Sequence, residues 1–179
     1  PAAASVISVG LAGLGLHGQR YAQHLIHGDV PGARLCAVHR RDHDAGLAWA
    51  ATKNLRYCRT LEELVSSPDV DLVVAVLPPA LHPRAIELAA EARKPILVEK
   101  PLAPDPSSAS RACQAAAEAG ILAMVAHTLR FNTVIRSLRA LIPELGALSV
   151  VAINQRFEPI NRTWLDQPEH GGLVLNTGI

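Results

Sequence analysis

A chain of 179 residues has room for one domain and part of a second. Hydrophobic residues make up 49% of the chain and charged residues 18%, which is typical of a packed core and argues against disorder. The formal net charge of +1 gives no electrostatic reason to expect a nucleic acid or an acidic membrane surface as a partner.

Membrane, leader and metal signals are also absent from the sequence pattern. No apolar run approaches the roughly 20 residues of a bilayer span. The first residues show no signal-peptide pattern and no Met, so we interpret the start as processed or cut. We interpret three cysteines as reduced core thiols of a cytoplasmic protein: Cys36, Cys58 and Cys113. The best histidine cluster, His39 and His43, straddles a strand end and a helix start, so we predict no metal site.

The first predicted element is a strand that runs into a glycine-rich loop. An apolar, β-branched run at residues 6–9 leads into G-x-G-x-x-G at 13–18, directly before a predicted helix. Gly13 permits the tight turn, Gly15 lets a pyrophosphate approach the backbone, and Gly18 lets the helix pack close to the strand. The helix start directs unpaired N–H groups at the phosphates. The predicted cofactor contacts here are Gly13, Gly15, Leu16, His17 and Gly18.

The following segments alternate between helix and strand. Further strands are predicted at 34–39, 55–58, 70–77, 95–99 and 121–126. The first helix, at 19–27, is predicted to bury Leu25 and Ile26. Thr60 and Glu63 form a capping box, and Asp105 is predicted to cap the alanine-rich helix that stops at Gly120. This alternation predicts an α/β fold with a doubly wound, parallel Rossmann sheet.

Polar motifs gather where the predicted strands end. Ligands of such sheets bind beyond the carboxyl ends of the strands. Those ends hold residues 13–18, 40–41, 77–82, 99–101 and 127–132. We therefore expect one rim of the sheet to carry the whole cofactor site.

Arg40 and Arg41 follow the second strand, where a site for NAD has an acidic residue that binds the ribose 2′-hydroxyl. A carboxylate would repel a 2′-phosphate, whereas a guanidinium pairs with it through two hydrogen bonds. We therefore predict a preference for NADP, with NAD as the other possible cofactor. The alternative interpretation is a pair of solvated arginines at a strand end.

Lys100 lies at the end of the fifth strand, within Glu-Lys-Pro at 99–101. A half-buried lysine there can lower its pKa and exchange a proton near neutral pH. Oxidation of an alcohol by hydride transfer needs such a proton acceptor. The alternatives are a salt bridge between neighbours or a lysine that only contacts the cofactor ribose.

Several of these motifs together resemble the Gfo/Idh/MocA oxidoreductases. The resemblance rests on the glycine loop, Pro-Pro-Ala-Leu-His at 78–82, Glu-Lys-Pro-Leu at 99–102, Arg-Phe-Asn at 130–132 and Gly-Gly-Leu-Val-Leu-Asn-Thr-Gly at 171–178. It implies NAD(P)-dependent dehydrogenation or reduction of a sugar, inositol or related polyol, with Lys100 catalytic and the Lys100–Pro101 bond cis. It also implies that His82 and Glu99 lie near the nicotinamide. Rim position and resemblance together assign to the cofactor Leu77, Pro78, His82, Glu99, Lys100 and Arg130.

The pattern changes after residue 127. Residues 131–142 are predicted to be helical and 147–157 to form a long strand. We divide the chain into a Rossmann domain at 1–127 and, at 128–179, the incomplete beginning of a substrate domain. The resemblance implies that this second domain is α/β with an open, mostly antiparallel sheet, through which the full-length protein forms a homo-oligomer.

Asn176 departs from the family pattern, which has Asp at that position and a His that would follow Ile179. Asparagine can orient a substrate hydroxyl but cannot act as a base, so we assign Asn176 to the catalytic set with an orienting role. Because family members are roughly twice as long, the chain is interpreted as a fragment. Two alternatives stay open: a dinucleotide-binding scaffold or sensor without turnover, and a reductase of a non-sugar carbonyl or a tetrapyrrole.

Overall fold

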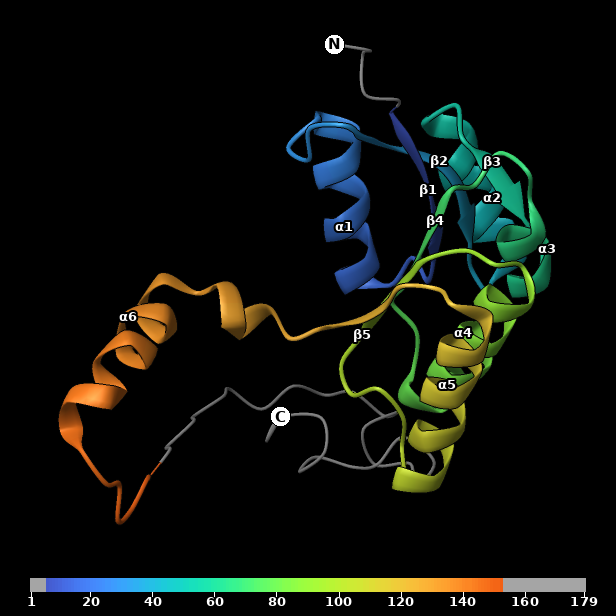
Figure 1. Cartoon of the computed structure of the whole chain (residues 1–179). Coiled ribbons are helices and arrows are strands. Elements are labelled where there is room, and N and C mark those ends of the chain that lie inside the picture. Colours follow the sequence, from blue (N-terminus) through green and yellow to red (C-terminus); the bar gives the residue numbers. More distant parts are fainter. Residues whose placement is uncertain (1–5, 153–179) are drawn as a thin grey trace, which may run out of the picture.

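The computed structural model describes residues 6–152, and its centre is a sheet of six parallel strands (Figure 1). The strands are β1 (Ile7–Ala12), β2 (Ala33–His39), β3 (Arg56–Cys58), β4 (Leu72–Ala75), β5 (Ile96–Glu99) and β6 (Ala123–Ala126). Their order in the sheet is β3-β2-β1-β4-β5-β6, with every neighbouring pair parallel. The order reverses between β1 and β4, as in a doubly wound sheet, and the predicted Rossmann fold is confirmed.

Helices connect the strands in the predicted alternation. The α-helices are α1 (Leu16–His27), α2 (His43–Thr52), α3 (Leu61–Ser66), α4 (His82–Glu91), α5 (Pro106–Ala119) and α6 (Thr133–Leu141). Short 3-10 turns lie at η1 (Pro79–Leu81), η2 (Thr128–Phe131) and η3 (Ile142–Leu145). No helix among residues 6–152 is long and apolar enough to cross a membrane.

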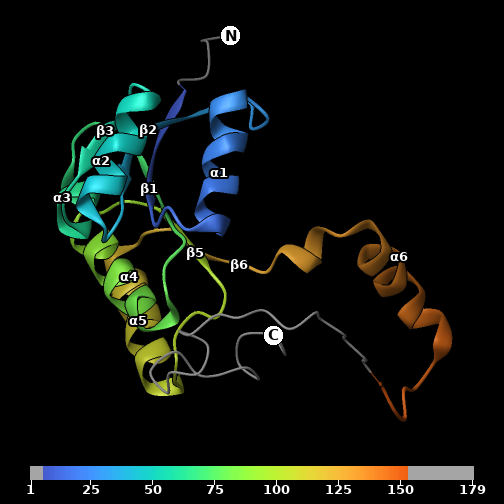
Figure 2. The same ribbon diagram turned by 180° about the vertical axis from the view of Figure 1, so that it is seen from behind.

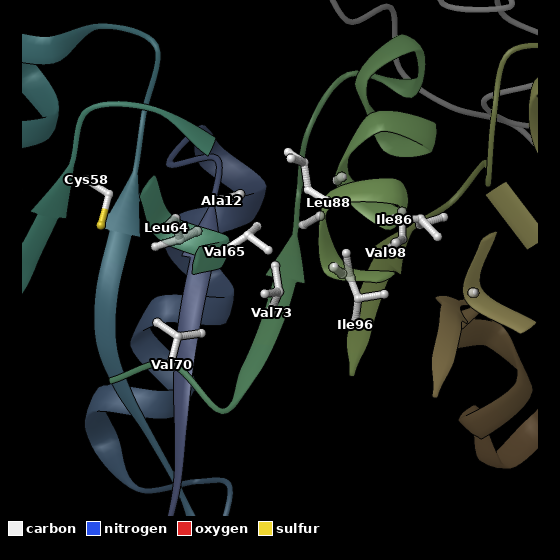
Figure 3. Packing of buried hydrophobic residues seen from close by; sticks show 14 of the residues in the cluster. Ala12, Cys58, Leu64, Val65, Val70, Val73, Ile86, Leu88, Ile96 and Val98 are labelled. Carbon is white, nitrogen blue, oxygen red and sulfur yellow. The ribbon is translucent and has the colours of Figure 1, made fainter. Parts of the chain in front are cut away.

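Two apolar layers cover the two faces of the sheet. On one face, Val9 and Leu11 of β1 pack with residues of α1 and α2. On the other, Ala12 of β1 packs with residues of α3, α4 and α5, among them Leu64 and Ile86 (Figure 3). Side chains alternate between the faces of a strand, so a strand covered on both sides is apolar almost throughout. This double cover makes the carboxyl rim the open part of the sheet.

The two predicted N-caps are formed, with one correction. Thr60 and Asp105 each accept a hydrogen bond from the backbone N–H three residues ahead, and so does Asp42 at the start of α2. Gly120 ends α5 in the left-handed conformation, at φ 66°. The carboxylate of Glu63 accepts from the N–H of Arg59, 2.8 Å away, and not from the N–H of the cap residue as the capping box predicts.

Two burial predictions are wrong. Ile26 is 40% exposed, because in the last turn of α1 the residue that packs against the core is Leu25 and not Ile26. Cys113 is exposed as well. It is one position away from the stripe of α5 that faces the core, which consists of Ser108, Ala112 and Ala116.

The chain leaves the sheet after β6, and α6 lies apart from it in both views (Figures 1 and 2). The predicted strand at 147–157 is not formed over residues 147–152, and its remainder lies outside the described residues. A strand needs a neighbour for its backbone groups, and the described residues offer none there. The predicted second domain, residues 128–179, is described only to residue 152, so the division at residue 127 stays a prediction.

Candidate functional site

The loop between β1 and α1 is closed so tightly that two of its positions require glycine. Gly13 has φ +97°, and a Cβ there would overlap the carbonyl oxygen of Val76, which follows β4. A Cβ on Gly18 would overlap the carbonyl oxygen of Gly13. The backbones of β1 and β4 continue to pair at this point, since the N–H of Val76 donates to Ala12 at 2.8 Å. Gly13 and Gly18 therefore fix the start of α1 directly over the end of β1.

Gly15, the third glycine, has open space around it. It is the N-cap of α1, and a Cβ built on it meets no atom within 4 Å. No side chain of the described residues caps this helix, and α1 has no acidic residue in its first turn. Leu16 is 80% exposed beside it. Uncapped N–H groups and the positive helix end attract an anion, so this cradle fits the pyrophosphate of a dinucleotide.

The second part of the rim follows β2 and carries two arginines. Arg40 is half-buried and Arg41 is exposed. The Tyr57 hydroxyl donates to the Arg40 carbonyl at 3.1 Å, which fixes the backbone at this turn. Neither guanidinium has an ion pair among residues 6–152. Within the described residues, neither positive charge is therefore paired with a carboxylate.

Glu99, at the end of β5, is the most densely bonded group of the rim. It is only 8% exposed. Its Oε1 accepts hydrogen bonds from His17 Nε2 at 2.8 Å and from the Tyr21 hydroxyl at 2.6 Å. Its Oε2 accepts from the backbone N–H of Lys100 at 3.0 Å. The Glu-Lys-Pro segment and the glycine-loop helix are thereby joined through one carboxylate.

These contacts decide the protonation states of Glu99 and Tyr21. Burial alone raises the pKa of Glu99, but the hydrogen bonds from His17, Tyr21 and the Lys100 amide outweigh burial and hold the pKa below its ordinary value. Burial raises the pKa of Tyr21, and its bond to Glu99 raises it further. Glu99 is therefore a carboxylate near neutral pH, and Tyr21 is a phenol that donates to it. An ionised acceptor also requires the proton of His17 to be on Nε2.

His82 lies against the Glu-Lys-Pro segment at residues 99–101. The Lys100–Pro101 bond is cis, as the resemblance implies. The ring of His82 is completely buried, and its Nδ1 donates to the Pro101 carbonyl at 2.6 Å. Its Nε2 has no hydrogen-bond partner among the described residues. Burial lowers the pKa of His82, which keeps the ring neutral. The observed contact of this side chain is with the loop of Lys100.

Other predicted cofactor contacts lie further along the rim. Leu77 and Pro78 are half-buried after β4. Arg130 is exposed in η2 and borders an open hollow of about 470 Å³ with Met124, Phe131, Arg136 and Arg139. β6 is three strands away from β1, about 14 Å at the usual strand spacing. Arg130 thus lies at the far side of the rim from the glycine loop, and Asn176 lies outside the described residues.

Sequence reasoning missed Tyr21 as a member of this site. It lies four residues after His17, so both point from the same face of α1, and their rings meet edge to face at 5.4 Å. That spacing is the only signal in the sequence. Within the described part of the chain, no three His, Cys, Asp or Glu side chains come together as a metal site would require.

The fold and the glycine loop define an α/β protein built to bind a dinucleotide. The model of the Gfo/Idh/MocA oxidoreductase family, with an NAD-binding Rossmann fold, matches residues 7–127. The chain belongs to this family.

Named relatives agree with that assignment. Inositol 2-dehydrogenase 1 of Mycolicibacterium vanbaalenii is 33% identical over 148 residues, which cover 79% of this chain and 42% of that protein. The apo scyllo-inositol dehydrogenase of Lactobacillus casei has a TM-score of 0.73 at 26% identity, covering 79% of this chain and 42% of that one. The biliverdin reductase of Synechocystis, solved with biliverdin and NADP+, has a TM-score of 0.69 at 25% identity. The match covers 80% of this chain and 45% of that one. The chain spans about half the length of its relatives, or less.

Proposed function

We propose that this chain is the cofactor-binding part of an NADP-preferring oxidoreductase that acts on a sugar, an inositol or a related polyol or carbonyl compound. The observation that carries the proposal is the loop at residues 13–18. Gly13 and Gly18 close it sterically, while Gly15 leaves the uncapped start of α1 open. Such a loop binds a pyrophosphate through backbone N–H groups.

The preference for NADP is supported by the second part of the rim. Arg40 and Arg41 stand where a site for NAD has an acidic residue, and neither has an ion pair in the described part of the chain. A guanidinium forms charge-assisted, bidentate hydrogen bonds with a phosphate. We assign the 2′-phosphate of the cofactor to these two residues.

The chemistry of the reaction is divided between cofactor and protein. When bound, the nicotinamide supplies or accepts the hydride. Lys100 takes up or returns the proton of the substrate hydroxyl, because it follows β5 on the same rim as the glycine loop. Asn176 orients a hydroxyl group of the substrate without acting as a base. The substrate class is supported by the names of the relatives, three of which are inositol dehydrogenases.

Turnover by the full-length protein tests this proposal. We expect NADP-dependent oxidation of at least one compound in a panel of inositols, aldoses and polyols. Lys100→Met should lose kcat and keep most of the cofactor affinity, because the proton acceptor is removed while the glycine loop is intact. Unchanged kcat in this variant would remove the lysine from the mechanism. Cofactor binding without turnover of any sugar, carbonyl compound or tetrapyrrole would favour a dinucleotide-binding scaffold or sensor, which Asn176 in place of Asp makes a defined alternative.

A further inference from the structure

Tyr57 of β3 holds the backbone of Arg40 and the ring of His43 at the same time. Its hydroxyl donates its single proton to the Arg40 carbonyl at 3.1 Å. The same oxygen lies 2.7 Å from Nδ1 of His43, which is the first residue of α2. Since the hydroxyl proton is already used, Nδ1 carries a hydrogen and donates it to Tyr57. The other ring nitrogen of His43, Nε2, is therefore the one that takes up a proton when the ring becomes charged.

Close packing at Gly46 keeps this arrangement in place. A Cβ on Gly46 would come within 2.5 Å of the Tyr57 ring and within 3.1 Å of the Arg40 Cβ. A side chain at this position would therefore push α2 away from β3 and from the turn that follows β2. The rings of His43 and Tyr57 meet edge to face, with their centroids 6.3 Å apart. His43 is itself exposed, so a ligand at the rim can reach its ring.

The charges around the Tyr57 hydroxyl leave the phenol protonated and the His43 ring free of a carboxylate partner. Four charged groups act on the hydroxyl: Arg59, Asp42, Glu63 and Asp44. Burial raises the pKa of Tyr57, and the three carboxylates raise it further against the effect of the arginine. The Asp42 carboxylate accepts from the Ala45 N–H, and that of Glu63 from the Arg59 N–H. Over residues 6–152, His43 forms no ion pair.

We propose that His43 is a third ligand of the cofactor's 2′-phosphate, beside Arg40 and Arg41, and that it binds in its charged form. The inference rests on the proposed function, which assigns the 2′-phosphate to the two arginines. His43 lies three positions after Arg40 and is joined to the Arg40 backbone through one hydroxyl oxygen. With Nδ1 donating to Tyr57, only the charged ring has a second N–H to donate to a phosphate oxygen.

This role makes the preference for NADP depend on pH. An imidazole gains its charge between about pH 5 and pH 8, whereas a guanidinium stays charged throughout. The contribution of His43 to NADP binding is therefore present at the acidic end of this interval and absent above it. NAD lacks the 2′-phosphate, so its affinity should not depend on His43.

The test is calorimetric titration of the chain with NADP and with NAD, at about pH 6 and about pH 8.5, in the parent and in His43→Asn. The amide NH2 of the variant still donates to Tyr57 but takes up no charge. At the lower pH, His43→Asn should bind NADP roughly tenfold more weakly than the parent. At the higher pH, the two should differ by less than about threefold. NAD affinity should be the same in both proteins.

Two controls isolate the histidine. The 2′-phosphate itself titrates, near pH 6, but parent and variant receive the same ligand, so the ratio of their affinities reports His43. His24→Asn is the matched control, because His24 is another exposed histidine whose Nδ1 contacts a carboxylate, that of Asp29, at 2.8 Å. It lies in the last turn of α1, at the opposite end from the glycine loop, and its loss should change neither affinity. Tyr57→Phe removes the acceptor for Nδ1 and should weaken NADP binding a few-fold.

Three results would overturn the inference. His43→Asn could bind NADP as tightly as the parent at the lower pH, or lose NADP and NAD affinity equally, or lose NADP affinity by the same factor at both pH values. His43→Gln repeats the test if His43→Asn does not fold. A parent that binds neither cofactor, or both equally, would instead refute the proposed function or its NADP preference. A preference for NADP that His43→Asn leaves intact would refute only the third ligand.

Discussion

Substituting Gly13 and Gly15 by alanine should separate the folding role of the glycine loop from its binding role. At Gly13 the backbone has φ +97°, and a Cβ would overlap the Val76 carbonyl. The strained conformation costs about 1–3 kcal/mol and the overlap another 1–3 kcal/mol, roughly. The carbonyl cannot move away cheaply, because the same residue pairs with Ala12 through its N–H at 2.8 Å. We therefore expect Gly13→Ala to lose about 2–6 kcal/mol of stability.

Gly15→Ala is the matched control, since a Cβ there meets nothing within 4 Å and its φ of −68° suits any residue. Its stability should stay within about 1 kcal/mol of the parent, while its NADP affinity should fall because the new methyl group occupies the pyrophosphate approach. Thermal unfolding and NADP titration of both variants are the assay. For a chain of this size the loss in Gly13→Ala corresponds to roughly 4–24 °C in Tm. A Gly13→Ala variant as stable as the parent, or a Gly15→Ala variant that binds NADP equally well, would refute this reasoning.

Two further outcomes are expected. Arg40→Asp should lose about 1.5–3 kcal/mol of NADP binding, roughly tenfold or more, with NAD binding preserved; titrations of both cofactors measure this, and unchanged NADP affinity would count against the assignment. Lowering the pH from 7.5 to 5 should destabilise the protein through His82: burial lowers its pKa from an ordinary value near 6.5, so the unfolded chain binds the proton first and the stability present above pH 6.5 is lost as the pH falls. His82→Asn keeps a donor for Pro101 without titrating, so its Tm should fall less over this interval. An identical fall in both proteins would exclude His82 as a source.

The parts of the fold that depend on local patterns were predictable from the sequence. Apolar runs located all six strands, and the caps at Thr60 and Asp105 follow from residue type at a helix start. The limits of individual strands were less predictable: β4 is formed over Leu72–Ala75 and not over the whole apolar run at 70–77. An apolar run indicates which side chains are buried, whereas a strand ends where its backbone stops hydrogen-bonding to the neighbouring strands.

The candidate site was predictable residue by residue but not as an arrangement. The place of Lys100 and Glu99 at the end of a predicted strand assigned both to the site. The donors that hydrogen-bond Glu99, however, are 78 and 82 residues away in the sequence, at Tyr21 and His17. No spacing in the sequence reports such a pairing. His82 was expected near the nicotinamide, and what the fold adds is its buried bond to Pro101. Sequence patterns indicate which groups reach the rim, and only tertiary packing decides which of them bond to one another.

Titration of the protein with NADP and with NAD, by calorimetry or by the fluorescence of the reduced forms, tests the central claim most directly. The glycine loop and the two arginines, which have no ion pair within residues 6–152, predict that both cofactors bind, and that NADP binds more tightly by roughly tenfold or more. Equal affinities would contradict the role given to Arg40 and Arg41. Binding of neither cofactor would contradict the account of the rim as a dinucleotide site.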